Sequence, residues 1–82
     1  MFDVYPNPFT EEAVIMFTGE YEFQPHTVEL FSADGSRAWL KAVPAGISEL
    51  PIAGAGLAPG VYYLKVSSGR ISSVRKVVRL QR

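Results

Sequence analysis

Cysteine is absent from the 82-residue chain, which excludes a disulfide framework and any thiolate metal site. One histidine, His26, and two aspartates leave little from which an active site could be built. No apolar run approaches the roughly 20 residues of a membrane helix, and no charged start followed by an apolar stretch marks a signal peptide. The sequence therefore predicts a protein that is not an enzyme, with no catalytic residues, no metal ligands, no cofactor and no transmembrane segment of its own.

His26 is the only side chain that could act as a general base near neutral pH. Its position in a turn signal predicts a surface residue and not a catalytic group. Four early glutamates offer oxygen atoms to calcium, but no Asp-x-Asp-x-Asp loop accompanies them, and solvated strand faces explain them better. These glutamates are Glu11, Glu12, Glu20 and Glu22.

Helical periodicity is also missing, and what the chain contains instead is short strands separated by turn signals. Hydrophobic residues make up 48% of the chain and charged residues 20%, which is typical of one small globular domain. We therefore predict a single domain over residues 1–82, excised from a larger secreted protein. The expected fold is an all-β, immunoglobulin-like antiparallel β-sandwich of about seven strands, with a small barrel as the alternative. The expected strands are Phe2–Tyr5, Ala13–Thr18, Thr27–Ala33, Arg37–Val43, Ser48–Ile52, Val61–Ser67 and Ile71–Leu80.

Alternation of apolar and polar residues assigns faces to these strands. In the last strand it predicts that Val74, Lys76, Val78 and Leu80 point inward. Phe31 interrupts the alternation, so it either covers the second face or is re-aimed by a bulge near the turn at Asp34. The residues expected to be largely buried are Val28, Leu30, Trp39, Tyr62, Leu64, Val66 and Val78.

Charge is unevenly spread, although the formal net charge is zero. Most acidic residues precede the first basic residue, Arg37, and the segment from Gly60 onward contains basic residues without an acid. Two interpretations stay open: pairing between early and late strands, or a basic patch that faces a partner. The patch is a weak footprint for nucleic acid, so no nucleic-acid partner is expected.

Two further patterns have plain interpretations. The aromatic residues could form an exposed row that stacks on sugar rings, but a domain this small needs their area in its core. They are Tyr5, Tyr21, Trp39, Tyr62 and Tyr63. The glycine-containing segment 53–56 is followed by no Lys-Ser/Thr pair or helix, so it is interpreted as a flexible connection.

Three landmarks then stand in order along the chain. Tyr5, Pro6, Asn7 and Pro8 open it, Leu57–Val66 contains Gly-Val-Tyr-Tyr-Leu-Lys-Val, and Lys76–Leu80 closes it. From Val4 to Leu80 the chain resembles the type A C-terminal sorting domain of the type IX secretion system. The hairpin segment Phe31–Arg37 resembles that family too, although Ser32 stands where the family often has an aspartate.

The resemblance implies a sorting signal that directs an N-terminally fused cargo across the outer membrane and is usually cleaved afterwards. It implies type IX outer-membrane shuttle and translocon proteins and a sortase-like protease as partners, with passage through the periplasm to the cell surface or the medium. The alternative is a non-catalytic adhesive or carbohydrate-binding sandwich of an extracellular enzyme. The residues assigned to sorting and partner recognition are Tyr5, Pro6, Asn7, Pro8, Gly60, Tyr62, Lys65, Lys76, Val77, Val78 and Arg79.

Residue chemistry adds expectations about the two ends of this signal. The prolines should hold the opening motif extended, with Tyr5 packed on the core. Lys76 either protects a sheet edge, with its stem reaching out to solvent, or contacts the machinery. The last strand, basic through Arg75 and Arg79, could be offered to a partner by strand addition.

Overall fold

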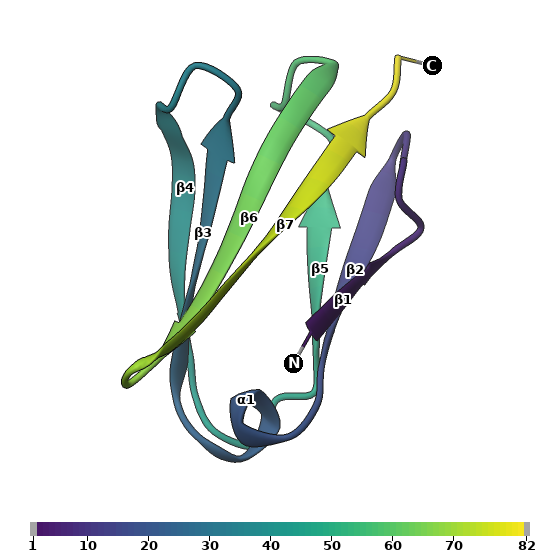
Figure 1. The fold of residues 1–82 in the computed structure, drawn as a ribbon. Coiled ribbons are helices and arrows are strands. Elements are labelled where there is room, and N and C mark those ends of the chain that lie inside the picture. The colour runs from purple at the N-terminus through teal and green to yellow at the C-terminus, as the bar shows by residue number, and fades with distance from the viewer. Residues whose placement is uncertain (1, 82) are drawn as a thin grey trace.

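The computed structural model describes residues 2–81, except for the side chain at position 20, and folds them into two antiparallel sheets packed face to face (Figure 1). One sheet has the order β1-β2-β5 and the other the order β4-β3-β6-β7. The predicted antiparallel sandwich of seven strands is confirmed. The elements are β1 (Phe2–Tyr5), β2 (Glu12–Phe17), α1 (Glu20–Phe23), β3 (His26–Ser32), β4 (Arg37–Val43), β5 (Glu49–Ala53), β6 (Gly60–Ser68) and β7 (Ile71–Arg79).

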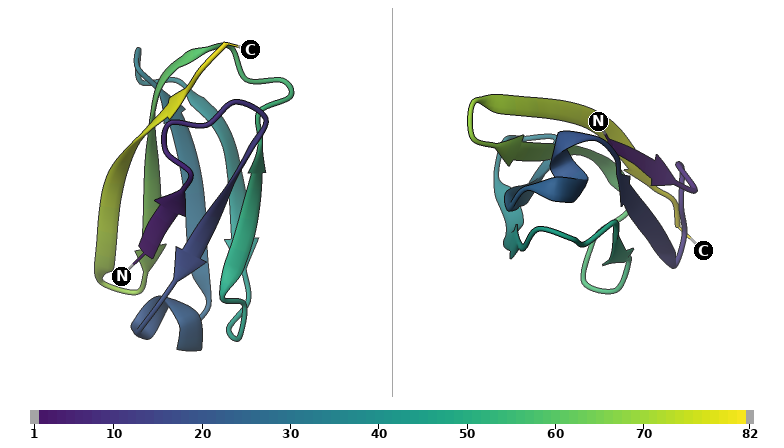
Figure 2. Two further views of the ribbon diagram at one scale, coloured as in Figure 1. Left: turned by 90° about the vertical axis from the view of Figure 1, so that its right-hand side faces the viewer. Right: turned by 90° about the horizontal axis from the view of Figure 1, so that it is seen from below.

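The short helix α1 was not predicted, because a single turn is too short to show helical periodicity. It closes one open end of the sandwich, as the view from below in Figure 2 shows. Tyr21 points inward from α1 and is 1% exposed. Its hydroxyl lies 3.2 Å from the Val66 carbonyl oxygen and 3.1 Å from Ser73 Oγ. The helix therefore contributes a core side chain that bonds β6 and β7 of one sheet, and its ring centre lies 6.2 Å from that of Phe2 in the other sheet. No helix in the described part of the chain is long and apolar enough to cross a membrane.

The core lies between the sheets and contains most of the residues predicted for it. Val28, Leu30, Tyr62, Leu64 and Val66 are buried, as expected. Two predictions are wrong. Trp39 is only partly buried, at the rim, because β4 is an edge strand that the three-stranded sheet does not fully cover. Val78 is also only partly buried.

Val78 does not point into the core because β7 turns toward the core the face opposite to the one predicted. In the β6–β7 ladder Tyr62 lies opposite Val77, and Leu64 lies opposite Arg75. Directly opposed residues point to the same side of a sheet, so Val77 faces the core and is 1% exposed. Val74 and Lys76 consequently point outward, and Val74 is 60% exposed. The two-residue loop between Ser68 and Ile71 sets this register.

The β3–β4 hairpin contains a bulge next to Phe31. Leu30 pairs with Trp39 and Phe31 pairs with Arg37, so Ala38 of β4 has no direct partner. Phe31 itself lies on the outer face, opposite Tyr63 of β6. Both features that the sequence left open as alternatives are therefore present together.

The turn of this hairpin is longer than the two residues that Asp34 and Gly35 suggested. It is closed by a hydrogen bond from the Gly35 N–H to the Ser32 carbonyl at 2.9 Å. Ser32 Oγ donates to Asp34 Oδ1 at 2.5 Å, and the Ser36 N–H donates to the same oxygen at 2.9 Å. These hydrogen bonds, led by that from Ser32, lower the pKa of Asp34 from 3.8 to about 2.

Candidate functional site

The opening motif and the closing strand, which lie about 70 residues apart in sequence, meet along one edge of the sandwich (Figure 1). β7 is the last strand of its sheet, so its outer edge has no neighbouring strand. The segment Tyr5–Phe9, called here the docked segment, lies along the C-terminal half of that edge. The structure therefore brings all three motifs together: the opening motif lies on the outer edge of β7, and β6, which contains the middle motif, pairs with its other edge.

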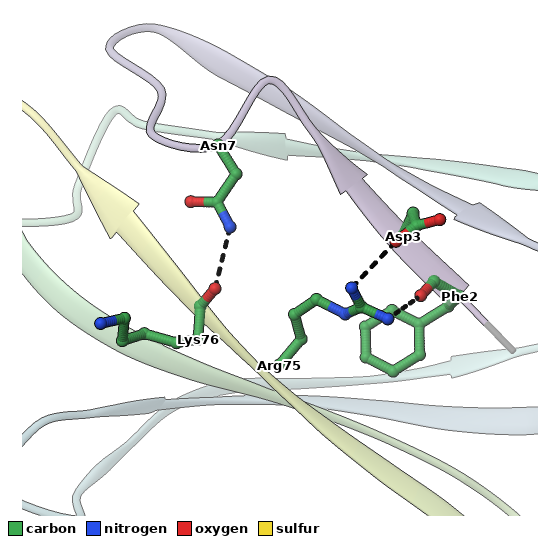
Figure 3. A network of polar contacts seen from close by, with 5 residues as sticks. All are labelled: Phe2, Asp3, Asn7, Arg75 and Lys76. Carbon is green, nitrogen blue, oxygen red and sulfur yellow. Dashed lines mark hydrogen bonds and ion pairs between the residues drawn. The ribbon is translucent and has the colours of Figure 1, made fainter.

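Asn7 makes the junction with both ends of its side-chain amide. Its Nδ2 donates to the Lys76 carbonyl oxygen at 2.8 Å (Figure 3), and its Oδ1 accepts from the Val78 N–H at 3.0 Å. A side-chain amide has one acceptor and one donor group, as a backbone peptide does. Asn7 therefore satisfies the β7 edge in place of a neighbouring strand.

The backbone of Phe9 extends this pairing along the outer edge of β7. Its N–H donates to the Val78 carbonyl at 2.9 Å, and its carbonyl accepts from the Leu80 N–H at 2.7 Å. The Phe9 ring is 2% exposed and belongs to the core. The edge of β7 from Lys76 to Leu80 is thus closed by hydrogen bonds and anchored by a buried ring.

The conformation of the docked segment differs from the expected extended chain. Residues 6–8 form bends, and the Tyr5–Pro6 and Asn7–Pro8 peptide bonds are cis. Tyr5 is 72% exposed and is not packed on the core as predicted. It lies opposite Val14 in the β1–β2 ladder, while Val4 takes the inward position beside it.

Arg75 points to the inner side of β7 and is paired within the fold, although its side chain is 42% exposed. Its Nη2 donates to the Phe2 carbonyl at 2.9 Å, and its Nη1 lies 3.0 Å from Asp3 Oδ1 (Figure 3). The guanidinium carbon is also 5.5 Å from the centre of the Phe2 ring. Arg75 therefore joins the unpaired edge of β1 to β7.

Arg79 is likewise used within the fold. Its Nε donates to the Gly54 carbonyl at 3.1 Å, and its Nη1 donates to the Leu80 carbonyl at 2.9 Å. A second ion pair joins Arg37 to Glu29 at 3.3 Å. Pairing between an early acid and a late base therefore occurs at Asp3 and Arg75, whereas Arg79 bonds backbone carbonyls.

Gly54 was predicted to lie in a flexible connection, but hydrogen bonds and close contacts hold its backbone in place. Its N–H donates to the Glu11 carbonyl at 2.7 Å. A Cβ atom at this position would lie 2.7 Å from the Thr10 oxygen and 2.8 Å from Arg79 Nε. Only glycine permits this close approach of three segments.

The remaining predicted residues lie on the paired strands β6 and β7. Val77 is buried in the core. Tyr62 is buried too, and its hydroxyl donates to the Ala58 carbonyl at 2.7 Å, which closes the turn before β6. Gly60 lies opposite Arg79 at the start of β6. Lys65 lies on the outer face of β6, opposite Val74, outside the docked segment.

His26 is buried and does not lie at the surface, contrary to the prediction from its turn signal. It begins β3, is 4% exposed and packs 4.2 Å from the Phe17 ring centre. Its Nδ1 lies 3.0 Å from the Gln24 carbonyl, which can only accept, so Nδ1 carries the proton. Within residues 2–81, no group of three His, Cys, Asp or Glu residues is placed to hold a metal ion.

The aromatic residues do not form one row. Tyr5 lies on the outer face of β1, Tyr63 lies on the outer face of β6, and Trp39 lies at the inner rim of β4. Trp39 and Leu57 line a shallow hollow of about 480 Å³ between β4 and β5, with Lys41 Nζ 5.1 Å from the Trp39 ring centre. The geometry therefore does not support the sugar-stacking row that the alternative function requires.

The family comparison agrees with the geometry of the motifs. A family model described as the secretion system C-terminal sorting domain matches residues 3–80. This match covers the docked segment, β7 and everything between them. No curated protein matches the chain.

Proposed function

Because the chain belongs to the family of C-terminal sorting domains of the type IX secretion system, we propose that the docked segment and the closing residues 76–80 together form the recognised part of its signal. The family is a sorting signal and not a catalyst, and its function is export to the cell surface or secretion. The cargo is fused at the N-terminal side of the chain and passes through the periplasm. Outer-membrane shuttle and translocon proteins then bind the signal, and a sortase-like protease removes it.

The contact of Asn7 with Lys76 and Val78 carries this proposal. It joins two motifs that are far apart in sequence through both ends of one side chain. A partner that binds this edge recognises a surface that forms only when the chain folds. The unfolded chain would present the same residues without this arrangement.

The exposed and buried residues of the signal have different roles. Tyr5 and Lys76 are exposed, and their side chains make no hydrogen bond or ion pair within the described residues, so they are the groups available to a partner. Val77, Tyr62 and Arg79 are held within the fold and support the edge from behind. This division assigns recognition to the surface of the motif and stability to its inner side.

The test is export of a periplasmic reporter fused to the N-terminus of this chain in a host with type IX machinery. We expect the wild-type fusion to reach the surface or medium, and the variant with Tyr5→Ser and Lys76→Ser to stay in the periplasm. The matched control is Phe23→Ser with Lys41→Ser, which also removes one exposed aromatic ring and one exposed amine. A wild-type fusion that is retained would contradict the function, and normal export of the Tyr5 and Lys76 variant would contradict the placement of the signal.

A further inference from the structure

The docked segment covers only half of the β7 edge, and the other half is open. The contacts at Lys76, Val78 and Leu80 show that the backbone groups of these even-numbered residues point to the outer edge. Backbone groups alternate in direction along a strand, so Ser72 and Val74 present their N–H and C=O groups to the same edge. No strand and no docked segment pairs with them among residues 2–81.

The open half, residues 71–74, contains no proline, and its side chains at Ile71 and Val74 are 39% and 60% exposed. An exposed edge with β-branched side chains is a template for pairing with another chain. The docked segment closes the other half of this edge, so the open half is a distinct surface.

Cations surround this open half. Lys65 lies directly opposite Val74 on the outer face, Lys76 follows two residues along β7, and Arg70 occupies the hairpin loop at its start. None of the three makes an ion pair with a described residue. Glu29 lies opposite Lys65 on β3, but its carboxylate is engaged by Arg37 at 3.3 Å. The outer face of the other sheet carries Glu12 and Glu49 instead, together with Asp3, which is paired with Arg75 at 3.0 Å.

We infer that residues 72–74 of β7 accept an extended, acidic segment of a partner protein as a fifth strand of the β4-β3-β6-β7 sheet. Main-chain hydrogen bonds supply affinity in this type of recognition, and the three cations favour a partner with carboxylates and speed its approach. Pairing with the β7 edge of a second copy would bring the same cations of two molecules together, which opposes self-association. The inference rests on the proposed function, in which the partner is part of the export machinery.

A proline at position 74 tests the inference directly. Val74→Pro removes an N–H that points outward, and proline favours the extended conformation that Ser73 already has. Val74→Thr is the matched control, because it keeps the N–H and the β-branch. In the reporter assay we expect Val74→Pro to lower export by about tenfold or more through lost main-chain pairing, and Val74→Thr to leave export near the wild-type level.

The outcomes separate the inference from the function on which it rests. Export of the wild-type fusion together with normal export of a folded Val74→Pro variant, as judged by thermal unfolding of the purified chain, would overturn strand addition and leave the sorting function intact. Failure of the wild-type fusion would instead count against the sorting function. If Val74→Pro does not fold, Ser72→Pro, at the other open position, takes its place.

Charge-reversal variants provide a second test of the inference. Replacement of Lys65 and Arg70 by glutamate should reduce export, whereas Glu49→Lys on the opposite face should not, and unchanged export in the first variant would overturn the acidic partner. Sedimentation of the purified chain tests the competing occupant. A wild-type dimer that Val74→Pro abolishes would show that a second copy takes this edge, and the inference would be wrong.

Discussion

Asn7 has an effect on this fold that is large for one exposed side chain. It hydrogen-bonds the Lys76 carbonyl and the Val78 N–H, and so replaces the strand that β7 lacks on that side. Neither proline beside it has an N–H to donate, so the amide of Asn7 supplies the donor at this point. The identity of the residue is therefore set by the need for one donor and one acceptor together.

Replacing Asn7 tests this role without the export machinery. Asn7→Ala should lower the free energy of unfolding by about 1–2 kcal/mol, because two hydrogen bonds are lost at an exposed edge. Asn7→Asp keeps the acceptor for Val78 but sets a carboxylate oxygen against the Lys76 carbonyl, so it should not restore stability. Urea denaturation measures both changes. Hydrogen exchange at the Val78 amide should accelerate in Asn7→Ala, and an unchanged rate would contradict the contact.

Gly54 fixes the other side of the same edge. A methyl group there would collide with the Thr10 oxygen and Arg79 Nε, so Gly54→Ala should destabilise the domain by about 1–3 kcal/mol. Ala55→Ser, at the exposed neighbouring position, should change stability by less than about 0.5 kcal/mol. Equal denaturation midpoints for the two variants would show that the three segments are not packed closely around Gly54.

Asp34 gives the fold a pH dependence with a defined sign. Its pKa is lowered to about 2 by hydrogen bonds from Ser32 and Ser36, so the folded state binds the proton less readily than the unfolded state. Its contribution to stability is therefore present above pH 3.8 and is lost as the pH falls through about 2. A carboxyl carbon titration by NMR should give a midpoint near 2, and Asp34→Asn should remove this part of the acid sensitivity. A midpoint near 4 would contradict the hydrogen-bonded turn.

Among the elements, β7 shows where prediction from sequence succeeds and where it fails. The strand bounds follow from local turn signals and lie within one residue of the structure at every end. The alternation of residues predicts the wrong inward face for β7, because valines occur on both faces of this strand, at 74, 77 and 78. Its pairing with β6 decides between them, and no local pattern contains that register. The cover that Asn7 provides is a contact across about 70 residues, which no motif spacing reveals.

Alanine substitutions distinguish the two faces of β7. Val77→Ala removes two methyl groups from a side chain that is 1% exposed and should cost about 2 kcal/mol of unfolding free energy. Val74→Ala removes the same atoms from an exposed position and should cost less than about 0.5 kcal/mol. The opposite order in urea denaturation would restore the face that alternation alone predicted.

At the scale of the whole molecule, the two sheets differ in the charge of their outer faces. The β1-β2-β5 sheet presents Asp3, Glu12 and Glu49, while the β4-β3-β6-β7 sheet presents Lys65 and Lys76 beside the Glu29–Arg37 pair. The net charge of zero conceals this separation. A neutral domain with one basic face can be oriented by an acidic partner, and salt should weaken that steering.

The central claim is that the opening motif and the closing strand act as one signal because they are joined at Asn7. Reporter export by wild type, Asn7→Ala, Val78→Pro and the double variant tests it most directly, since Val78→Pro removes the N–H that Asn7 binds. If the two motifs act through this contact, the double variant should lose no more export than the more impaired single variant. Losses that multiply in the double variant would contradict the claim, because they would show that the machinery reads the two motifs independently.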